Sequence, residues 1–505
     1  MATLTLAGSN KDQEQRDAQP SSGGIWENDI IQFIVLLGIT FVSVYYTPRY
    51  VNEVIFLVFL PLIYRSKKDY LWMAWFFVII DAPGRLFSCE GANDPRIPLY
   101  TLGAGASLLF QELFILVYLA KFYFDKEKLQ FVFKKPFLYF YLVMLVFLIF
   151  SLLLGMNVKS MILTFRALLP WALVFIVPFF INDPDKVYRA GRLIFPFAFL
   201  ALAAQVYTFI TGSYLDNAIR GVRFVYDFHV KEGGDVSRAW SANFISLFAL
   251  ILSMFYLLSK KKLFNSNYLA AVGFCATLQV FLSATRGYTL AYGFLMAASM
   301  LQMAQSSKVF KLFNLAIAAM VVFYILQLVF PPIGYQVSAA SKRISTIFLL
   351  AEGDISAGGT LSRIDVRGKR VLDKFEESPI LGWGFSTTYF EYEDGHVGPQ
   401  TMLLNVGVVG AIYLNVLYLY LCLVTWLYSR KKKPRQEWGK APIVFLFGLI
   451  AIFFIHGSST QFWGYSIEFE QEEKVMTLAF LFAAFHALIV HTGTEPVPSV
   501  SKRPI

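Results

Sequence analysis

The chain has 505 residues, of which 57% are hydrophobic and 15% are charged. Soluble domains carry about 25% charged residues, so this composition excludes an ordinary soluble protein and indicates lipid as the main solvent. Lysine and arginine exceed the acids by 44 − 34 = 10. In a soluble protein this excess would suggest nucleic acid as a partner, but membrane topology explains it here, and we expect no nucleic-acid partner.

The first segment, residues 1–24, is polar and ends in Pro20-Ser21-Ser22-Gly23-Gly24. It is too polar for a secretory signal peptide and is typical of a disordered arm. The first apolar run after it is therefore interpreted as a retained transmembrane helix. Cys275 and Cys422 lie in apolar runs, so the sequence indicates no disulfide framework.

The apolar runs predict the architecture. A helix needs about 20 apolar residues to cross the bilayer core, and by this measure the chain has about fourteen candidate spans. We therefore predict an all-α polytopic membrane protein: a bundle over 25–330, a long loop over 331–400, further helices over 401–491 and a tail at 492–505. The candidate spans lie near 30–47, 51–64, 70–82, 99–122, 137–154, 161–181, 190–211, 241–259, 267–283, 288–304, 309–330, 400–428, 441–456 and 475–491.

The positions of lysine and arginine predict the orientation, because these residues concentrate in cytoplasmic loops. With the N-terminus inside, all of the basic clusters fall on one side, so both termini are expected in the cytoplasm. These clusters are Arg65–Lys68, Lys126–Lys135, Lys186–Arg192, Lys260–Lys262, Lys308–Lys311 and Arg430–Lys433. The segments expected on the opposite, outward face are 83–98, 155–160, 212–240, 284–287, 331–400 and 457–474.

Two of the outward segments, 212–240 and 331–400, are long and contain arginines that membrane orientation does not explain. Long charged loops in a chain otherwise built to span lipid are candidates for function. Within the second loop, Ser362–Phe375 has the three- to four-residue spacing of an amphipathic helix. Pro379 disfavours helix in the residue before it, and Gly382-Trp383-Gly384 is then expected to be a turn.

Individual residues suggest what such a site could do. His396 stands where the long loop re-enters the membrane, and a neutral histidine there can accept a proton from a hydroxyl nucleophile. Arg286 lies in a short turn between two apolar helices, where a guanidinium can bind a lipid-linked phosphate bidentately. The alternatives are an ordinary surface histidine and an arginine that reaches for the interface. Glu112 lies inside an apparent span, which makes it either functional or half of a buried pair.

The order of these features resembles the O-antigen ligase/polymerase superfamily. The resemblance rests on an arginine-bearing loop helix, a Glu-x-Pro-apolar-apolar-Gly-x-Gly turn, and a histidine followed by glycines at plus eleven and plus fourteen. Thr285-Arg286-Gly287 is similar to the family's Ser-Arg-Gly, and Arg220-Gly221 to its first long loop. The residues that match the turn are Glu377, Pro379, Gly382 and Gly384, and those that match the histidine and its glycines are His396, Gly407 and Gly410. Val397 departs from the usual Asn, and Thr285 from the usual Ser.

The resemblance implies a GT-C-like glycosyltransferase of the bacterial inner membrane with a periplasmic site. Its donor would be an undecaprenyl-pyrophosphate-linked glycan, with no cofactor and no metal. Arg220, Arg223 and Arg286 would bind the pyrophosphate, and His396 would activate the acceptor hydroxyl. The loop arginines Arg343, Arg363 and Arg367 lie on the same side and would support the site.

Three functions stay open at this point. The number of spans favours a polymerase of lipid-linked repeat units, with which a chain-length regulator could associate. A ligase would transfer the glycan to lipid A-core or protein. A polysaccharide transporter or flippase is the alternative from another class, and it predicts two related halves with charges near the midplane, of which the sequence shows no convincing sign.

Overall fold

The computed structural model describes residues 28–83, 98–103, 106–125, 129–220, 242–303, 324–352, 364–395, 397–458 and 471–491, with the single positions 86, 317 and 321. Over these residues the fold is helical apart from one hairpin of two antiparallel strands, β1 (Leu99–Gly103) and β2 (Ala106–Leu109). The first helices are α2 (Asp29–Tyr46), α3 (Arg49–Arg65), α4 (Asp69–Asp81), α5 (Phe110–Phe124), α6 (Lys134–Leu153), α7 (Val158–Leu168), the 3-10 turn η3 (Leu169–Ala172), α8 (Leu173–Phe180), α9 (Pro184–Ile194) and α10 (Pro196–Thr211). They are followed by α11 (Leu215–Arg220), α12 (Asn243–Leu258), α13 (Ser266–Leu282), α14 (Arg286–Gln302), α16 (Pro331–Ala351), the π-helical turn η4 (Ile364–Gly368), α17 (Lys369–Phe375), α18 (Thr387–Tyr392), α19 (Gly398–Arg430), α20 (Lys432–Trp438), α21 (Ile443–Ser458), α22 (Gln471–Phe485) and the π-helical turn η5 (His486–Val490).

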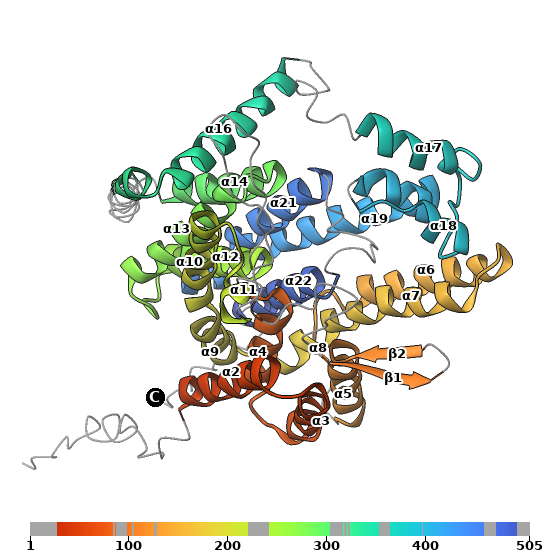
Figure 1. Cartoon of the computed structure of the whole chain (residues 1–505), viewed down its shortest axis with the longest axis horizontal. Coiled ribbons are helices and arrows are strands. Elements are labelled where there is room, and N and C mark those ends of the chain that lie inside the picture. Colours follow the sequence, from red (N-terminus) through yellow and green to blue (C-terminus); the bar gives the residue numbers. More distant parts are fainter. Residues whose placement is uncertain are drawn as a thin grey trace, which may run out of the picture.

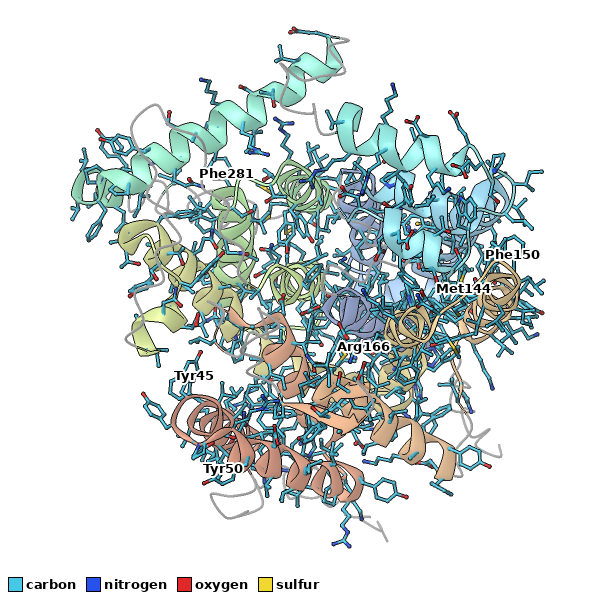
Figure 2. The ribbon with its side chains drawn as sticks, turned by 45° about the vertical axis from the view of Figure 1, so that its right-hand side comes forward. Tyr45, Tyr50, Met144, Phe150, Arg166 and Phe281 are labelled. Carbon is cyan, nitrogen blue, oxygen red and sulfur yellow. The ribbon has the colours of Figure 1, made fainter. Side chains whose placement is uncertain are left out.

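The structure is that of a helical membrane protein. In the described part of the chain, 6 helical stretches are long and apolar enough to cross a bilayer, or up to 7 if the bent pair of α20 and α21 counts as one. α12 and α13 are apolar but shorter. Large apolar side chains project outward from the peripheral helices α2, α3, α6 and α19, as expected where the surrounding solvent is lipid. Figure 2 shows Tyr45 and Tyr50 at this periphery.

One predicted span is wrong. The apolar run 99–122 does not form one helix, because its first part is the β1–β2 hairpin and only its second part belongs to α5. Gly103 and Gly105 interrupt the run, and glycine costs a helix interior about 1 kcal/mol relative to alanine. The Tyr100 hydroxyl donates to the Glu53 carbonyl oxygen (2.9 Å) and holds the hairpin to α3. Burial, and secondarily the charge of Glu53, raises the pKa of this phenol.

Most of the other predicted spans coincide with helices to within a few residues, although the run 309–330 lies largely outside the described residues. The expected long loop 331–400 is more helical than its composition suggests. It begins with α16 and continues, after a stretch outside the described residues, with η4 and α17, in agreement with the helix predicted over Ser362–Phe375. Figure 1 shows α16, α17 and α18 along one side of the molecule.

Several contacts join segments that are expected on the same side of the membrane. On the side expected to be cytoplasmic, Lys68 and Arg189 both pair with Asp29 (2.9 and 3.2 Å), and Lys121 donates to the Ser66 carbonyl oxygen (2.6 Å). The basic segment after α12 meets α20 through the Lys261–Glu437 ion pair. Among the described residues, the segment Arg65–Lys68 thus adjoins Lys186–Arg192 through Asp29, and Lys260–Lys262 adjoins α20, whereas Lys308–Lys311 lies outside the described part.

The segments expected on the outward side also meet one another. The Asp81 carboxylate, at the end of α4, accepts from the Ile245 amide at the start of α12 (2.6 Å). The Thr387 amide of the long loop donates to the Gly155 carbonyl oxygen (3.2 Å). Each of these contacts joins segments that are far apart in the sequence.

Two helices form the centre of the bundle. α12 packs against α4, α10, α13, α14, α21 and α22, and α22 packs against α4, α8, α9, α12 and η3 (Figure 1). Every residue of α12 except its last is buried, and α22 with η5 is almost entirely buried from Lys474 onward. Such helices are apolar all round because they meet protein on every side.

Candidate functional site

The segment after α17 returns to the bundle as a tight turn, residues 378–386, which we call the return turn. Its glycines Gly382 and Gly384 have φ of 67° and 57°, which glycine adopts without steric cost. The Trp383 amide donates to the Leu404 carbonyl oxygen (2.8 Å) and the Gly384 amide to that of Asn405 (2.7 Å). The return turn therefore lies directly against the first part of α19.

Helix α19 is broken where the return turn meets it. Gly407 has φ 61° and ψ −172°, outside the helical region. Beyond the break, the amides of Val408 and Val409 donate to the carbonyl oxygens of Pro379 (2.9 Å) and Ile380 (3.1 Å). A Cβ at Gly407 would lie 2.5 Å from the Gly382 nitrogen. Gly382 and Gly407, 25 residues apart, are thus both required by one close backbone contact.

The return turn is also attached to α6. The Ser151 hydroxyl donates to the Phe147 carbonyl oxygen (2.5 Å) and accepts from the Phe385 amide (2.5 Å). A Cβ at Gly384 would lie 3.1 Å from the Phe147 carbonyl oxygen, closer than most side chains approach. The turn is therefore fixed between α6 and the broken α19.

A buried carboxylate follows α18. Asp394 is 8% exposed, and its oxygens lie 3.7 Å from Arg367 Nη1 and 4.0 Å from Arg370 Nη2. The Thr401 hydroxyl donates to the Asp394 carbonyl oxygen (2.8 Å). Arg367, one of the predicted support residues, thus holds the acidic segment two residues before His396.

Two other predicted arginines are brought together. Arg286 is the first residue of α14, and its Nε donates to the carbonyl oxygen of Arg343 on α16 (3.1 Å). The Gln336 side chain of α16 also donates to the Leu282 carbonyl oxygen (2.8 Å). The long loop therefore crosses the outward ends of α13 and α14 before it reaches the return turn.

The remaining predicted site residues cannot be placed as side chains. His396, Arg223 and Arg363 lie outside the described residues. Arg220 is the last residue of the short helix α11, and its side chain is outside the described part.

A second polar cluster, which we call the polar centre, joins Glu112 to four residues that the sequence did not single out: Arg166, His456, Glu472 and Lys474. Glu112, His456 and Lys474 are buried, whereas Arg166 and Glu472 are partly exposed. Arg166 Nε donates to Glu112 Oε1 (2.8 Å), and Arg166 Nη2 donates to the Ser107 carbonyl oxygen (2.9 Å). Glu472 interacts electrostatically with Glu112, Arg166 and Lys474, and His456 interacts with Lys474. Arg166 is labelled in Figure 2, and its side chain is 26% exposed, so its pair with Glu112 is only partly shielded from the surroundings.

The polar centre gives Glu112 an ion-pair partner, Arg166, which is the second of the two alternatives left open for this residue. This residue is 2% exposed but lies in the first turn of α5, where its other oxygen accepts from the Leu109 amide (2.7 Å). The sequence did not single out Arg166 or Lys474. Arg166 stands eight residues after the start of α7, and Lys474 is the last residue of a charged segment. Lys474 is nevertheless fully buried. An isolated charge next to an apolar run was the available signal.

An apolar groove lies beside the polar centre. It has a volume of about 530 Å³ and is formed by α5, α6, α7, η3 and α8. Leu148, Leu152, Met161, Phe165 and Leu168 contribute to its walls, and almost no polar surface is exposed in it. Its volume and apolar lining suit a hydrocarbon chain.

Among the residues that the structure describes, no group of three or more His, Cys, Asp or Glu side chains is arranged to hold a metal ion. Comparison with protein-family models and with curated proteins gives no match to this chain. The family resemblance therefore rests on the motif residues of the sequence.

Proposed function

We propose that this protein is a membrane glycosyltransferase of the O-antigen ligase/polymerase type that polymerises undecaprenyl-pyrophosphate-linked repeat units at the periplasmic face of the bacterial inner membrane. The observation that carries the proposal is the docking of the return turn into the break of α19. The motif glycines Gly382, Gly384 and Gly407 take part in one backbone contact, as expected if the motif encodes a structural unit. We also propose that the chain crosses the membrane fourteen times and that its helices have a GT-C-like arrangement.

The proposed chemistry begins with the donor. Its lipid chain stays in the bilayer, and the apolar groove beside α6 and α7 is a suitable place for it. Arg286, with Arg220 and Arg223, binds the pyrophosphate, whose charge grows as the glycosidic bond breaks. Fixed cations stabilise that developing charge without rearranging.

The acceptor reacts from the aqueous side. His396 takes a proton from, or orients, the acceptor hydroxyl as it attacks the sugar carbon. Arg367 supports this step by holding Asp394, close to His396 in sequence. Arg343 and Arg363 help to keep the long loop over the site. No metal or cofactor is needed in this scheme.

The test is transfer in detergent, where there is no membrane to cross. Purified protein is incubated with lipid-linked repeat units, and products are separated by length. We expect elongated glycan from the parent chain and from Arg435→Ala, a control arginine on α20. His396→Ala and Arg286→Ala should lose turnover while expressing normally. Near-normal activity in both variants would contradict the site assignment.

The same assay separates the alternatives. A ligase would transfer one glycan to lipid A-core or protein and would not elongate repeat units. The polar centre, with its buried Lys474, is the observation that favours a transporter, because buried charges line many transport paths. A flippase would give no product in detergent but would move labelled lipid-linked glycan across proteoliposome membranes.

A further inference from the structure

A second cavity lies on the basic side of the bundle, away from the return turn. Its volume is about 600 Å³, and it is formed by the segment before α6, the junction of α8 and α9, the end of α19 and the end of α22 with η5. Its lining is mixed. Gln130, Asn182, His486 and His491 are polar, whereas Pro178 and Phe179 are among the apolar residues.

One polar group in this cavity is buried and unsatisfied. His486 is 6% exposed, and its Nδ1 has no hydrogen-bond partner among the residues that the structure describes. Its ring packs edge-on against Phe131 (5.9 Å between centroids). His486 also begins the π-helical turn η5, a widened turn often found at functional sites. A buried imidazole nitrogen without a partner is costly, so a ligand that bonds to it would stabilise the fold.

Four lysines stand next to residues that line the cavity. Lys186 Nζ donates to Asn182 Oδ1 (2.8 Å) and lies 3.3 Å from Asp183 Oδ2, so the acid that lines the cavity is already paired. Lys431 Nζ lies 3.5 Å from the centre of the Tyr428 ring, another part of the lining. Lys134 and Lys135 begin α6, directly after the lining segment. The four lysines outnumber the one acid of the lining, Asp183, so the rim of the cavity has an excess of positive charge.

The level of the cavity in the membrane limits which molecules can occupy it. Its walls come from the ends of apolar helices, so it stands at the boundary between hydrocarbon and water. Basic pockets between transmembrane helices on this side of a membrane favour anionic lipid head groups. Apolar walls below a cationic rim match a molecule with hydrocarbon chains and a phosphodiester.

We infer that this cavity binds the head group of an anionic phospholipid from the leaflet on the basic side. The phosphodiester contacts His486 and the lysine rim, and the upper parts of its chains lie against Pro178 and Phe179. The lipid joins the end of α22 to α8, α9 and α19. This inference is independent of the proposed transferase activity.

The test is lipid binding by the full-length protein after delipidation in detergent. Native mass spectrometry and thermal unfolding are measured with added phosphatidylglycerol, with zwitterionic phosphatidylcholine, and with glycerol phosphate. We expect one tightly bound phosphatidylglycerol, a higher melting temperature, and little effect of the other two. His486→Leu and Lys186→Ala should each weaken binding roughly tenfold, the loss expected for one charge-assisted hydrogen bond.

The matched control is Lys262→Ala, an exposed lysine of the basic side outside the cavity lining. It should bind like the parent chain, and Lys186→Ala keeps the test valid if His486→Leu does not fold. Equal stabilisation by phosphatidylcholine, or unchanged binding in Lys186→Ala, would overturn the inference. So would saturation by glycerol phosphate alone, because the site would then recognise a soluble phosphate.

Discussion

Replacing Gly407 with alanine tests the junction between the return turn and α19. At φ 61° and ψ −172° the residue occupies a region used almost only by glycine, so alanine there costs about 1–3 kcal/mol. Its methyl group would also collide with backbone atoms of Ile380 and Gly382, which must move apart. The backbone bonds that cross the junction, from Trp383, Gly384, Val408 and Val409, then lengthen or break.

The size of the effect follows from these contributions. If two of these bonds are lost, at about 1 kcal/mol each, the total with the strain is about 3 kcal/mol. Because 1.4 kcal/mol is a factor of ten, the junction should open roughly a hundred times more often. Hydrogen exchange measured by mass spectrometry should show this acceleration in peptides that cover 379–386 and 404–410.

The control is Gly38→Ala, in the middle of α2, where a Cβ would meet no atom within 4 Å. It should leave exchange at the junction unchanged. If Gly407→Ala exchanged at the same rate as Gly38→Ala, the broken helix would not be the conformation of the protein, and the account of the motif glycines would fail.

Three further substitutions examine other parts of the structure. Glu112→Gln leaves Arg166 without its carboxylate partner and should lower the free energy of unfolding by about 2–3 kcal/mol. The control, Glu53→Gln, breaks an exposed pair with Arg49 and should change thermal unfolding little. Equal shifts in the two variants would mean that the polar centre is solvated. Ser151→Ala removes the acceptor for the Phe385 amide and should cost about 1 kcal/mol, visible as faster exchange in the return turn; unchanged exchange would show that α6 does not hold the turn. Arg367→Ala should leave stability within about 1 kcal/mol, because its side chain is half exposed, yet should reduce turnover if the proposed loop support is correct; full turnover would remove Arg367 from the site.

Much of the helical layout was predictable because apolar runs and helix ends are local signals. The starts of α6, α12 and α19 fall within a few residues of the predicted spans. The hairpin at 99–109 was not predicted, because an apolar run is compatible with either a strand or a helix. Only the two glycines, Gly103 and Gly105, indicated that a helix was unfavourable. The six helical stretches, or up to seven, that pass the length test are fewer than the predicted spans. Several apolar helices are short: α4 has only 13 residues.

The site was only partly predictable, for a different reason. The contact of Gly382 with Gly407 is consistent with the motif spacing, although the spacing itself says nothing about distance in space. Arg286 was selected for its charge at a helix start, and its partner Arg343 contributes a backbone carbonyl that no sequence pattern marks. The polar centre joins residues 112, 166 and 472 from three helices, and such a pairing is decided by packing alone.

The burial of α22 bears on how the protein is made. This helix lies in the middle of the bundle, yet among the described helices it is the last to be synthesised. The earlier helices α4, α8 and α12 must therefore enter the membrane before the helix that fills the space between them exists. Apolar helices are stable in lipid before α22 is present. During that time, however, Glu112 and Arg166 lack the neighbouring charges of Glu472 and Lys474. Assembly of the described helices therefore includes a step in which α22 moves between helices that are already in the membrane.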